Sequence, residues 1–232
     1  VVCPSRARLA FLYLLEKVVI MKLHGYWRSS AAYRVRIALN LKGLEAEHCP
    51  VHLIDNGGEQ HSVGYQLLNP AELVPTLEDG ELRLNQSLAI IQYLEEQYPQ
   101  QPLYPAHPAL KAQVMAFALD IACDIHPLNN LRVLQYLTGP LALSETQKMQ
   151  WIQHWLAVGF KALEKRLQGT AGRYCFGDEL SVADICLVPQ VYNALRFQLD
   201  MTEYPLIRAI YQRCNELEAF QKAAPEQQAD AV

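Results

Sequence analysis

Residues that could support chemistry gather where predicted strands meet predicted helices. Ser29 and Ser30 follow a short alternating segment, 22–26, and begin a helical pattern. A helix start exposes backbone N–H groups and the positive end of the helix dipole, so it stabilises an anion such as a thiolate. Because this junction holds no cysteine, a thiol used here would come from a bound ligand. Taken alone, the spacing favours a simple N-cap serine.

Two further junctions offer groups that suit a short peptide. Val74-Pro75 precedes a predicted strand, and a cis bond there would direct backbone N–H and C=O groups towards an extended ligand. The dipeptide alone favours a trans turn. Asn85-Gln86-Ser87 offers donors and a helix start to a carboxylate, although a plain N-cap at Ser87 explains it equally simply. Together the three junctions predict a site for a short anionic peptide.

Two arginines accompany these junctions. Arg28 lies beside the first junction, and Arg196 ends a predicted helix far along the chain. Guanidinium groups suit bidentate binding of carboxylates, although solvated surface charge is the simpler explanation for each arginine alone. Ser181-Val182-Ala183-Asp184 predicts a capping box, which we interpret as purely structural.

The elements that position these groups follow from hydrophobic periodicity and turn residues. We predict strands at 22–26, 45–53, 74–78 and 82–84, and helices at 30–41, 65–68 and 87–98. The order β-α-β-α-β-β-α predicts a small α/β domain with a mixed sheet. Crossover helices would pair parallel strands, and the Asp79-Gly80 turn would add an antiparallel hairpin.

A second, all-α domain is predicted after a linker. Pro99, Pro102, Pro105 and Pro108 recur at every third position, which favours a stiff, extended segment. Helical patterns follow near 109–124, 129–137, 144–167, 181–196 and 205–219. We assign 21–103 to the α/β domain and 104–232 to an all-helical substrate domain. Residues 1–20 form a leader that we interpret as an upstream translated stretch rather than a targeting signal.

Bulk composition excludes several classes of function. The 232-residue chain is 51% hydrophobic with a net charge of −4, which favours neither nucleic acid nor a membrane as partner. Its six cysteines are scattered without metal-binding spacing, so we predict no metal and mostly buried or inert thiols in a reducing, cytoplasmic compartment.

These motifs resemble those of the glutathione transferases, and specifically of the zeta class. The resemblance covers about residues 21–225, and it is carried by the segments 29–39, 74–77, 86–91 and 177–197. It implies a thioredoxin-like first domain, a helical second domain, a homodimer and glutathione as the cofactor.

The resemblance also implies roles for individual residues. Ser29 would be the hydroxyl beside the glutathione sulfur, and Val74 would act through its backbone before a cis proline. Arg28 and Arg196 match positions that hold substrate carboxylates. The glutathione-binding residues so implied are Ser29, Ser30, Arg34, Gln60, Val74, Pro75, Gln86, Ser87, His126, Asn130 and Arg132, and the catalytic ones are Arg28, Ser29, Ser30 and Arg196.

The implied activity is the isomerisation of a small dianion, best matched by maleylacetoacetate to fumarylacetoacetate in tyrosine and phenylalanine catabolism. A thiolate would add to the cis double bond, rotation would follow, and elimination would give the trans product. Many zeta proteins carry cysteine where this chain has Ala31. Maleylpyruvate isomerisation, conjugation or dehalogenation of small electrophiles, and a non-enzymatic regulatory protein remain alternatives.

Overall fold

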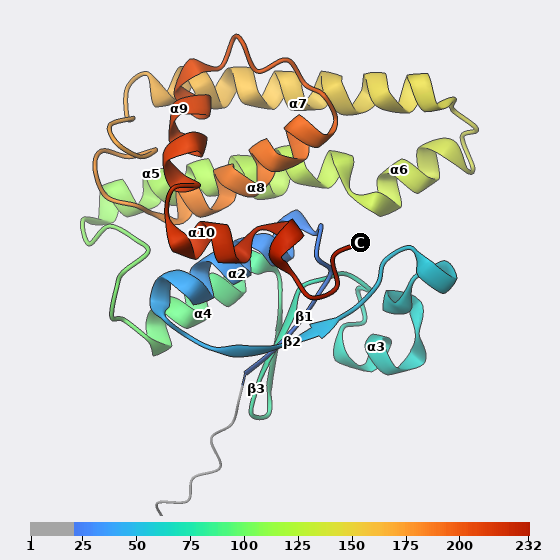
Figure 1. The fold of residues 1–232 in the computed structure, drawn as a ribbon. Helices are drawn as coiled ribbons and strands as arrows, with labels where there is room; N and C mark the ends of the chain where they lie inside the picture. The colour runs from blue at the N-terminus through green and yellow to red at the C-terminus, as the bar shows by residue number, and fades with distance from the viewer. Residues whose placement is uncertain (1–20) are drawn as a thin grey trace, which may run out of the picture.

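A four-stranded sheet forms the centre of the N-terminal part of this computed structural model, which describes residues 21–232 (Figure 1). Its order is β2-β1-β3-β4. The strands are β1 (Met21–Gly25), β2 (Ala46–Pro50), β3 (Thr76–Asp79) and β4 (Leu82–Asn85). β1 pairs parallel with β2 and antiparallel with β3, and β3 pairs antiparallel with β4. The sheet is mixed, as predicted, but only one crossover pairs parallel strands.

Helices α2 (Ser30–Lys42) and α4 (Ser87–Gln97) contact each other, and α2 also contacts helices of the C-terminal part. Figure 1 shows α2 between the sheet and these helices. Because both sides of α2 are covered, Arg34 and Arg36 are buried together with the apolar residues.

Several predicted boundaries in the α/β part are shifted. β2 ends at Pro50, so the predicted strand 45–53 is too long. Asp79 pairs with Leu82, so the hairpin turn consists of Gly80 and Glu81 rather than Asp79-Gly80. Gly80 adopts a φ of +61°, a left-handed conformation that glycine tolerates without strain. The short helix α3 (Val63–Leu68) begins earlier than predicted, with Ser62 as its N-cap.

The C-terminal part is helical, as predicted, with two corrections. The predicted helix 109–124 becomes α5 followed by the π-helical turn η3 (Asp120–Ile125) and the 3₁₀ turn η4 (His126–Asn129), and the predicted helix 205–219 is divided into two. No helix within residues 21–232 is long and apolar enough to cross a membrane. The α-helices are α5 (Pro108–Leu119), α6 (Leu131–Thr138), α7 (Glu145–Leu167), α8 (Val182–Arg196), α9 (Pro205–Cys214) and α10 (Glu218–Ala223).

The proline-rich connection is packed rather than free. Lys42 Nζ donates to the Tyr98 carbonyl at 2.8 Å and lies 2.6 Å from the Glu95 carboxylate. Leu103 is buried, and its carbonyl accepts the Val182 N–H at 2.9 Å. The connection therefore ties α2 and α4 to the start of α8, while the boundary at residue 103 stays a prediction.

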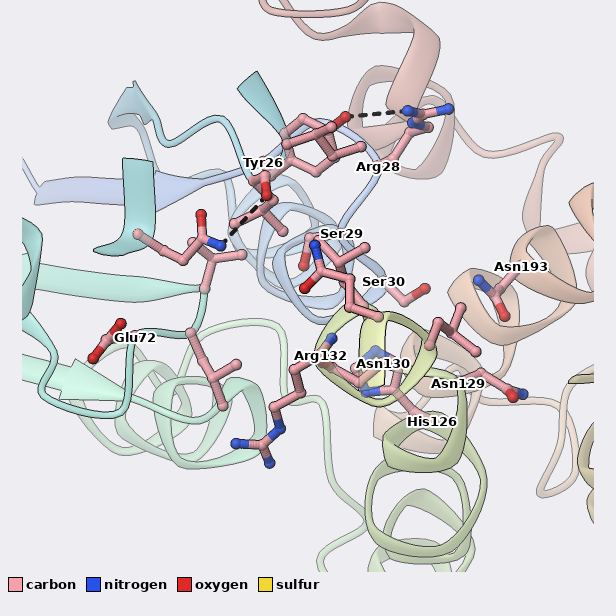
Figure 2. Close-up of a pocket in the computed structure, with 18 of the residues that line it drawn as sticks. Tyr26, Arg28, Ser29, Ser30, Glu72, His126, Asn129, Asn130, Arg132 and Asn193 are labelled. Carbon is pink, nitrogen blue, oxygen red and sulfur yellow. Dashed lines mark hydrogen bonds between the residues drawn. The ribbon is translucent and has the colours of Figure 1, made fainter. Parts of the chain in front are cut away.

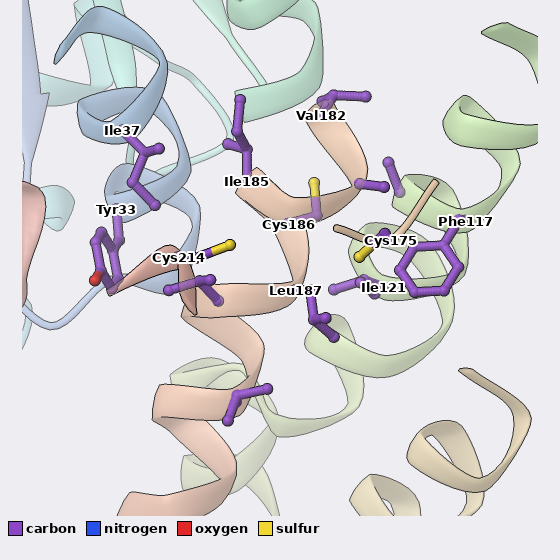
Figure 3. Close-up of a cluster of buried hydrophobic side chains, with 14 of the residues drawn as sticks. Tyr33, Ile37, Phe117, Ile121, Cys175, Val182, Ile185, Cys186, Leu187 and Cys214 are labelled. Atoms are coloured by element: carbon purple, nitrogen blue, oxygen red, sulfur yellow. The ribbon is translucent and has the colours of Figure 1, made fainter. Parts of the chain in front are cut away.

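The two parts share one core. Figure 3 shows Tyr33 and Ile37 of α2 facing α8, which carries Ile185 and Cys186. Burial raises the pKa of the Cys186 thiol to about 11, so this thiol stays protonated and unreactive at neutral pH. Of the five cysteines within residues 21–232, all are free, and three are buried in agreement with the prediction.

The capping box at Ser181 carries a buried carboxylate with a structural role. Asp184 has no exposed surface and accepts the N–H groups of Cys175 at 2.8 Å and Ser181 at 2.9 Å. Replacing Asp184 with alanine should lower the free energy of unfolding by about 3 kcal/mol, because two buried donors lose their acceptor. Urea unfolding measures this loss. Ser144→Ala, in the exposed capping box of α7, should cost only about 1 kcal/mol, and equal losses would contradict the account.

Candidate active site

Two adjoining cavities lie between the α/β part and the helical part. One, of about 300 Å³, contains Ser29, and the other, of about 330 Å³, contains Ser87. We call them the Ser29 cavity and the Ser87 cavity. They share lining residues that include Val74, His126 and Asn130, so together they form one continuous groove. Figure 2 shows Ser29 and Ser30 across this groove from His126, Asn130 and Arg132.

The groove brings together every site residue predicted from the sequence, although their roles stay predictions. The Ser29 cavity is lined by Arg28, Ser29, Ser30, Gln60 and Arg196. The Ser87 cavity is lined by Arg34, Pro75, Gln86 and Ser87. Val74, His126, Asn130 and Arg132 line both.

The two serines at the start of α2 are engaged differently. Ser29 is the N-cap, and its Oγ accepts the Ala32 N–H at 3.2 Å. As an acceptor in this bond, the Ser29 hydroxyl keeps its own proton for donation to a ligand. The Ser30 hydroxyl is buried and donates to the Pro189 carbonyl on α8 at 3.5 Å. Ser29 is therefore both a helix cap and a free donor, whereas Ser30 links α2 to the helical part.

The remaining junctions line the Ser87 cavity, and Val74 lines the Ser29 cavity as well. The Val74–Pro75 peptide bond is cis, as the resemblance implies and against the preference of the isolated dipeptide. Gln86 precedes α4 in a left-handed conformation and makes no side-chain cap. Ser87 is the first residue of α4 and is buried, with its Oγ 3.3 Å from Arg34 Nη1. The amides at the start of α4 therefore have no side-chain acceptor within residues 21–232.

The helical wall of the groove is built by an interruption of regular helix. The wider π-helical turn η3 ends at Ile125 and leads into η4, which begins with His126. Such turns often mark functional sites because they redirect side chains. Burial and the positive charge of Arg34 lower the pKa of His126 to about 3, so its imidazole is neutral at physiological pH. Asn130 caps α6 by accepting the Arg132 N–H at 3.2 Å.

The groove is positively charged, although the chain as a whole has a net negative charge. Arg28, Arg132 and Arg196 line the Ser29 cavity, where Glu72 is the one lining carboxylate within residues 21–232 and pairs with His61. Burial and repulsion from Arg28 lower the pKa of Arg196, but a guanidinium remains protonated. A cationic groove in a chain of net charge −4 suits a ligand with several carboxylates.

Sequence reasoning missed several polar residues of the Ser29 cavity, among them Tyr26 and Asn193. The Tyr26 hydroxyl accepts from Arg28 Nη2 at 3.2 Å (Figure 2). The Arg28 guanidinium also lies 4.5 Å from the Trp27 ring centre. Asn193 lies one turn before Arg196 on α8 and faces the same cavity. Helical spacing from Arg196 could have identified Asn193, because residues three apart share a helix face.

Comparisons with known proteins agree along nearly the whole chain. The family model described as the N-terminal domain of glutathione S-transferase matches residues 23–102, and that of the C-terminal domain matches residues 154–218. A probable maleylacetoacetate isomerase from Vibrio cholerae is 59% identical over 90% of this chain and 97% of its own length. A maleylpyruvate isomerase from a Ralstonia species is 48% identical over 91% of this chain and its own whole length.

Solved structures are also similar to this chain over most of its length. A holo structure of a bacterial zeta-class maleylpyruvate isomerase has a TM-score of 0.88 and 46% identity, covering 91% of this chain and 100% of the other. A maleylacetoacetate isomerase from Methylobacterium extorquens AM1, solved with bound malonate and GSH, has a TM-score of 0.87 and 38% identity, covering 91% and 99%.

Proposed function

Because the chain belongs to the zeta class of the glutathione S-transferase family, we propose that it is a glutathione-dependent isomerase converting maleylacetoacetate to fumarylacetoacetate. The observation that carries this proposal is the groove, in which a free Ser29 hydroxyl at a helix start adjoins Arg28 and Arg196. The hydroxyl can donate to a thiolate, and the two guanidinium groups can bind the carboxylates of a dianionic substrate that reacts with it.

The residues of the groove fit glutathione, a tripeptide with two carboxylates and one thiol. The start of α4 supplies amides without a side-chain cap, and Ser87 supplies a hydroxyl. Gln60 Oε1 is buried with no partner among residues 21–232, so it can accept a peptide N–H. Ser29, at the start of α2, supplies a donor and a helix dipole for sulfur. We assign Gln60, Val74, Gln86 and Ser87 to binding of the peptide.

The bound tripeptide supplies a sulfur nucleophile for reversible addition to the cis double bond. The chain's own residues bind and orient the tripeptide and the substrate. Ser29 donates its proton to the sulfur and so favours the thiolate. Arg28 and Arg196 hold the substrate carboxylates and fix the double bond beside Ser29, which reduces the entropic cost of the reaction. Negative charge moves to the substrate's ketone oxygen, where cationic groups of the groove lower the barrier.

The relatives also favour a second substrate, maleylpyruvate, because two close matches are named maleylpyruvate isomerases. Both substrates should be tested with purified protein and glutathione. We expect a higher kcat/KM for maleylacetoacetate, since the relative of that name has the greater identity, 59% against 48%. A higher kcat/KM for maleylpyruvate would reassign the substrate. Consumption of glutathione with an electrophile in place of isomerisation would favour the conjugating or dehalogenating alternative.

A homodimer and a cytoplasmic location are further parts of the proposal. Both follow from membership of the family alone. Sedimentation equilibrium of the purified chain tests the first, with twice the mass of 26.3 kDa expected. Fractionation of cells that produce the protein tests the second.

A further inference from the structure

Two aromatic residues hold the Arg28 guanidinium in the groove. Its Nη2 donates to the Tyr26 hydroxyl at 3.2 Å, and its Cζ lies 4.5 Å from the centre of the Trp27 ring. An arginine side chain loses much rotamer freedom when it is held in one position, so it needs such contacts to stay there. The position of Arg28 in the Ser29 cavity therefore depends on where Tyr26 and Trp27 lie.

Trp27 is itself fixed through its backbone. It is buried, and its indole Nε1 has no hydrogen-bond partner among the described residues. Its backbone N–H donates to the Asp230 carboxylate at 3.0 Å, and its carbonyl accepts from Arg36 Nη2 at 2.9 Å. Arg36 Nε also donates to the Ala223 carbonyl at 3.0 Å. Both backbone groups of Trp27 are thus tied, directly or through Arg36, to the C-terminal residues 223–232.

The segment after α10, which we call the C-terminal tail (224–232), follows a defined path. It includes the 3₁₀ turn η5 (Pro225–Gln227), and Figure 1 shows its end beside the loop that joins β1 to α2. Glu226 accepts the hydroxyl of Tyr192 on α8 at 2.5 Å. Gln228 Nε2 donates to two backbone carbonyls at 3.0 and 2.8 Å. The tail is therefore held against α8 and against the loop that carries Arg28.

The Asp230 carboxylate is also an electrostatic partner of Arg36. Both residues and Trp27 line one small cavity of about 20 Å³. Burial lowers the pKa of Arg36 to about 10, and the negative charge of Asp230 counteracts this shift. The guanidinium stays protonated at physiological pH, so Asp230 stabilises both groups that hold the Trp27 backbone. Loss of the carboxylate would leave the N–H of a buried residue without its acceptor.

We propose that Asp230 is a positioning residue for the isomerisation, because it holds Trp27 and thereby places the Arg28 guanidinium where it binds a substrate carboxylate. The inference rests on the proposed function, since it takes Arg28 as a ligand of the substrate. Asp230 does not line the groove, so its effect reaches the substrate through Trp27 and Arg28. Binding of glutathione, which we assign to other residues, should not depend on it.

The test replaces Asp230 in the full chain. Asp230→Ala should lower kcat/KM for the dianionic substrate about tenfold, because a displaced guanidinium no longer orients the carboxylate. The Kd of glutathione, measured by calorimetry, should change little. Hydrogen exchange of the Trp27 amide should become faster, since this N–H has lost its acceptor. Asp230→Asn keeps a side-chain oxygen that can accept the N–H, and it should retain most of the activity.

A double-mutant cycle with Arg28→Ala determines whether Asp230 acts through Arg28. In the Arg28→Ala background, Asp230→Ala should cost little further activity, because the guanidinium that it positions is already absent. Equal fold losses of kcat/KM in both backgrounds would overturn the inference. A lower Tm of Asp230→Ala with unchanged kcat/KM, or unchanged hydrogen exchange of the Trp27 amide, would also overturn it.

Asp178→Ala is the matched control. The Asp178 carboxylate also accepts a backbone N–H, that of Arg173, at 3.0 Å, and it lies outside the groove. This variant should lower the Tm and leave kcat/KM unchanged, and a loss of activity equal to that of Asp230→Ala would overturn the inference. An unchanged kcat/KM for Arg28→Ala would instead reject the carboxylate role that the proposed function gives Arg28. A loss for Arg28→Ala without one for Asp230→Ala rejects the inference alone.

Discussion

Replacing Ser29 with alanine is expected to lower kcat/KM about tenfold to a thousandfold, the scale of one lost hydrogen bond to a developing charge. The Ser29 hydroxyl accepts the Ala32 N–H at 3.2 Å and keeps its proton for the sulfur. Without that proton, the pKa of the bound thiol should rise. A titration of thiolate absorbance with glutathione bound measures this shift, and steady-state kinetics measure the loss of rate.

The substitution also removes a helix cap, which costs about 1 kcal/mol on its own. Ser144→Ala provides the control, because Ser144 caps α7 in an exposed capping box and does not line the groove. It should reproduce the loss of stability with normal turnover. Ser29→Thr keeps both the cap and the hydroxyl and should restore most of the activity. Full turnover by Ser29→Ala would remove Ser29 from the mechanism.

Replacing Arg196 with alanine should lower kcat/KM for the dianionic substrate about a hundredfold, because a charged contact with a carboxylate is lost. Arg28 and Arg196 line the same cavity, and the pKa of Arg196 is lowered first by burial and then by repulsion from Arg28. Two such charges are matched by two substrate carboxylates. The substitution should weaken binding and positioning of the substrate, and the Kd of glutathione should change little.

A monomethyl ester of the substrate separates charge from packing. The Arg196→Ala penalty should be smaller for the ester that lacks the carboxylate held by Arg196. In a double variant that also replaces Arg28 with alanine, the loss of kcat/KM, expressed as a free energy, should be smaller than the sum of the two single losses. The reason is that both arginines act on one ligand. Arg208→Ala removes an exposed arginine outside the groove and serves as the control. An unchanged kcat/KM for Arg196→Ala would exclude its carboxylate role.

Local signals predicted the junctions well. The N-caps at Ser29 and Ser181 depend on residues within one turn, and the structure places both as expected. The mixed sheet and the helical C-terminal part also followed from short-range periodicity. The turn at Gly80-Glu81 was displaced by one residue, because the register is set by pairing between strands rather than by the turn residues alone.

Other features depend on contacts far apart in the sequence and were missed for that reason. The π-helical turn at Asp120–Ile125 occurs inside an uninterrupted apolar pattern, and nothing in the local residues distinguishes it from α-helix. Burial of Arg34 and Arg36 results from coverage of α2 on both sides, whereas amphipathic patterning would place arginine in solvent. The break between α9 and α10, after Cys214, contains no glycine or proline from which it could have been predicted.

The central claim is that the chain uses glutathione as a catalyst for isomerisation of a dianion. Its most direct test follows maleylacetoacetate, fumarylacetoacetate and total glutathione in one reaction. We predict no enzymatic isomerisation without glutathione, many turnovers per glutathione with no loss of the thiol, and no activity with S-methylglutathione in its place. Enzymatic isomerisation without any thiol, or loss of one glutathione for each substrate molecule converted, would contradict the account.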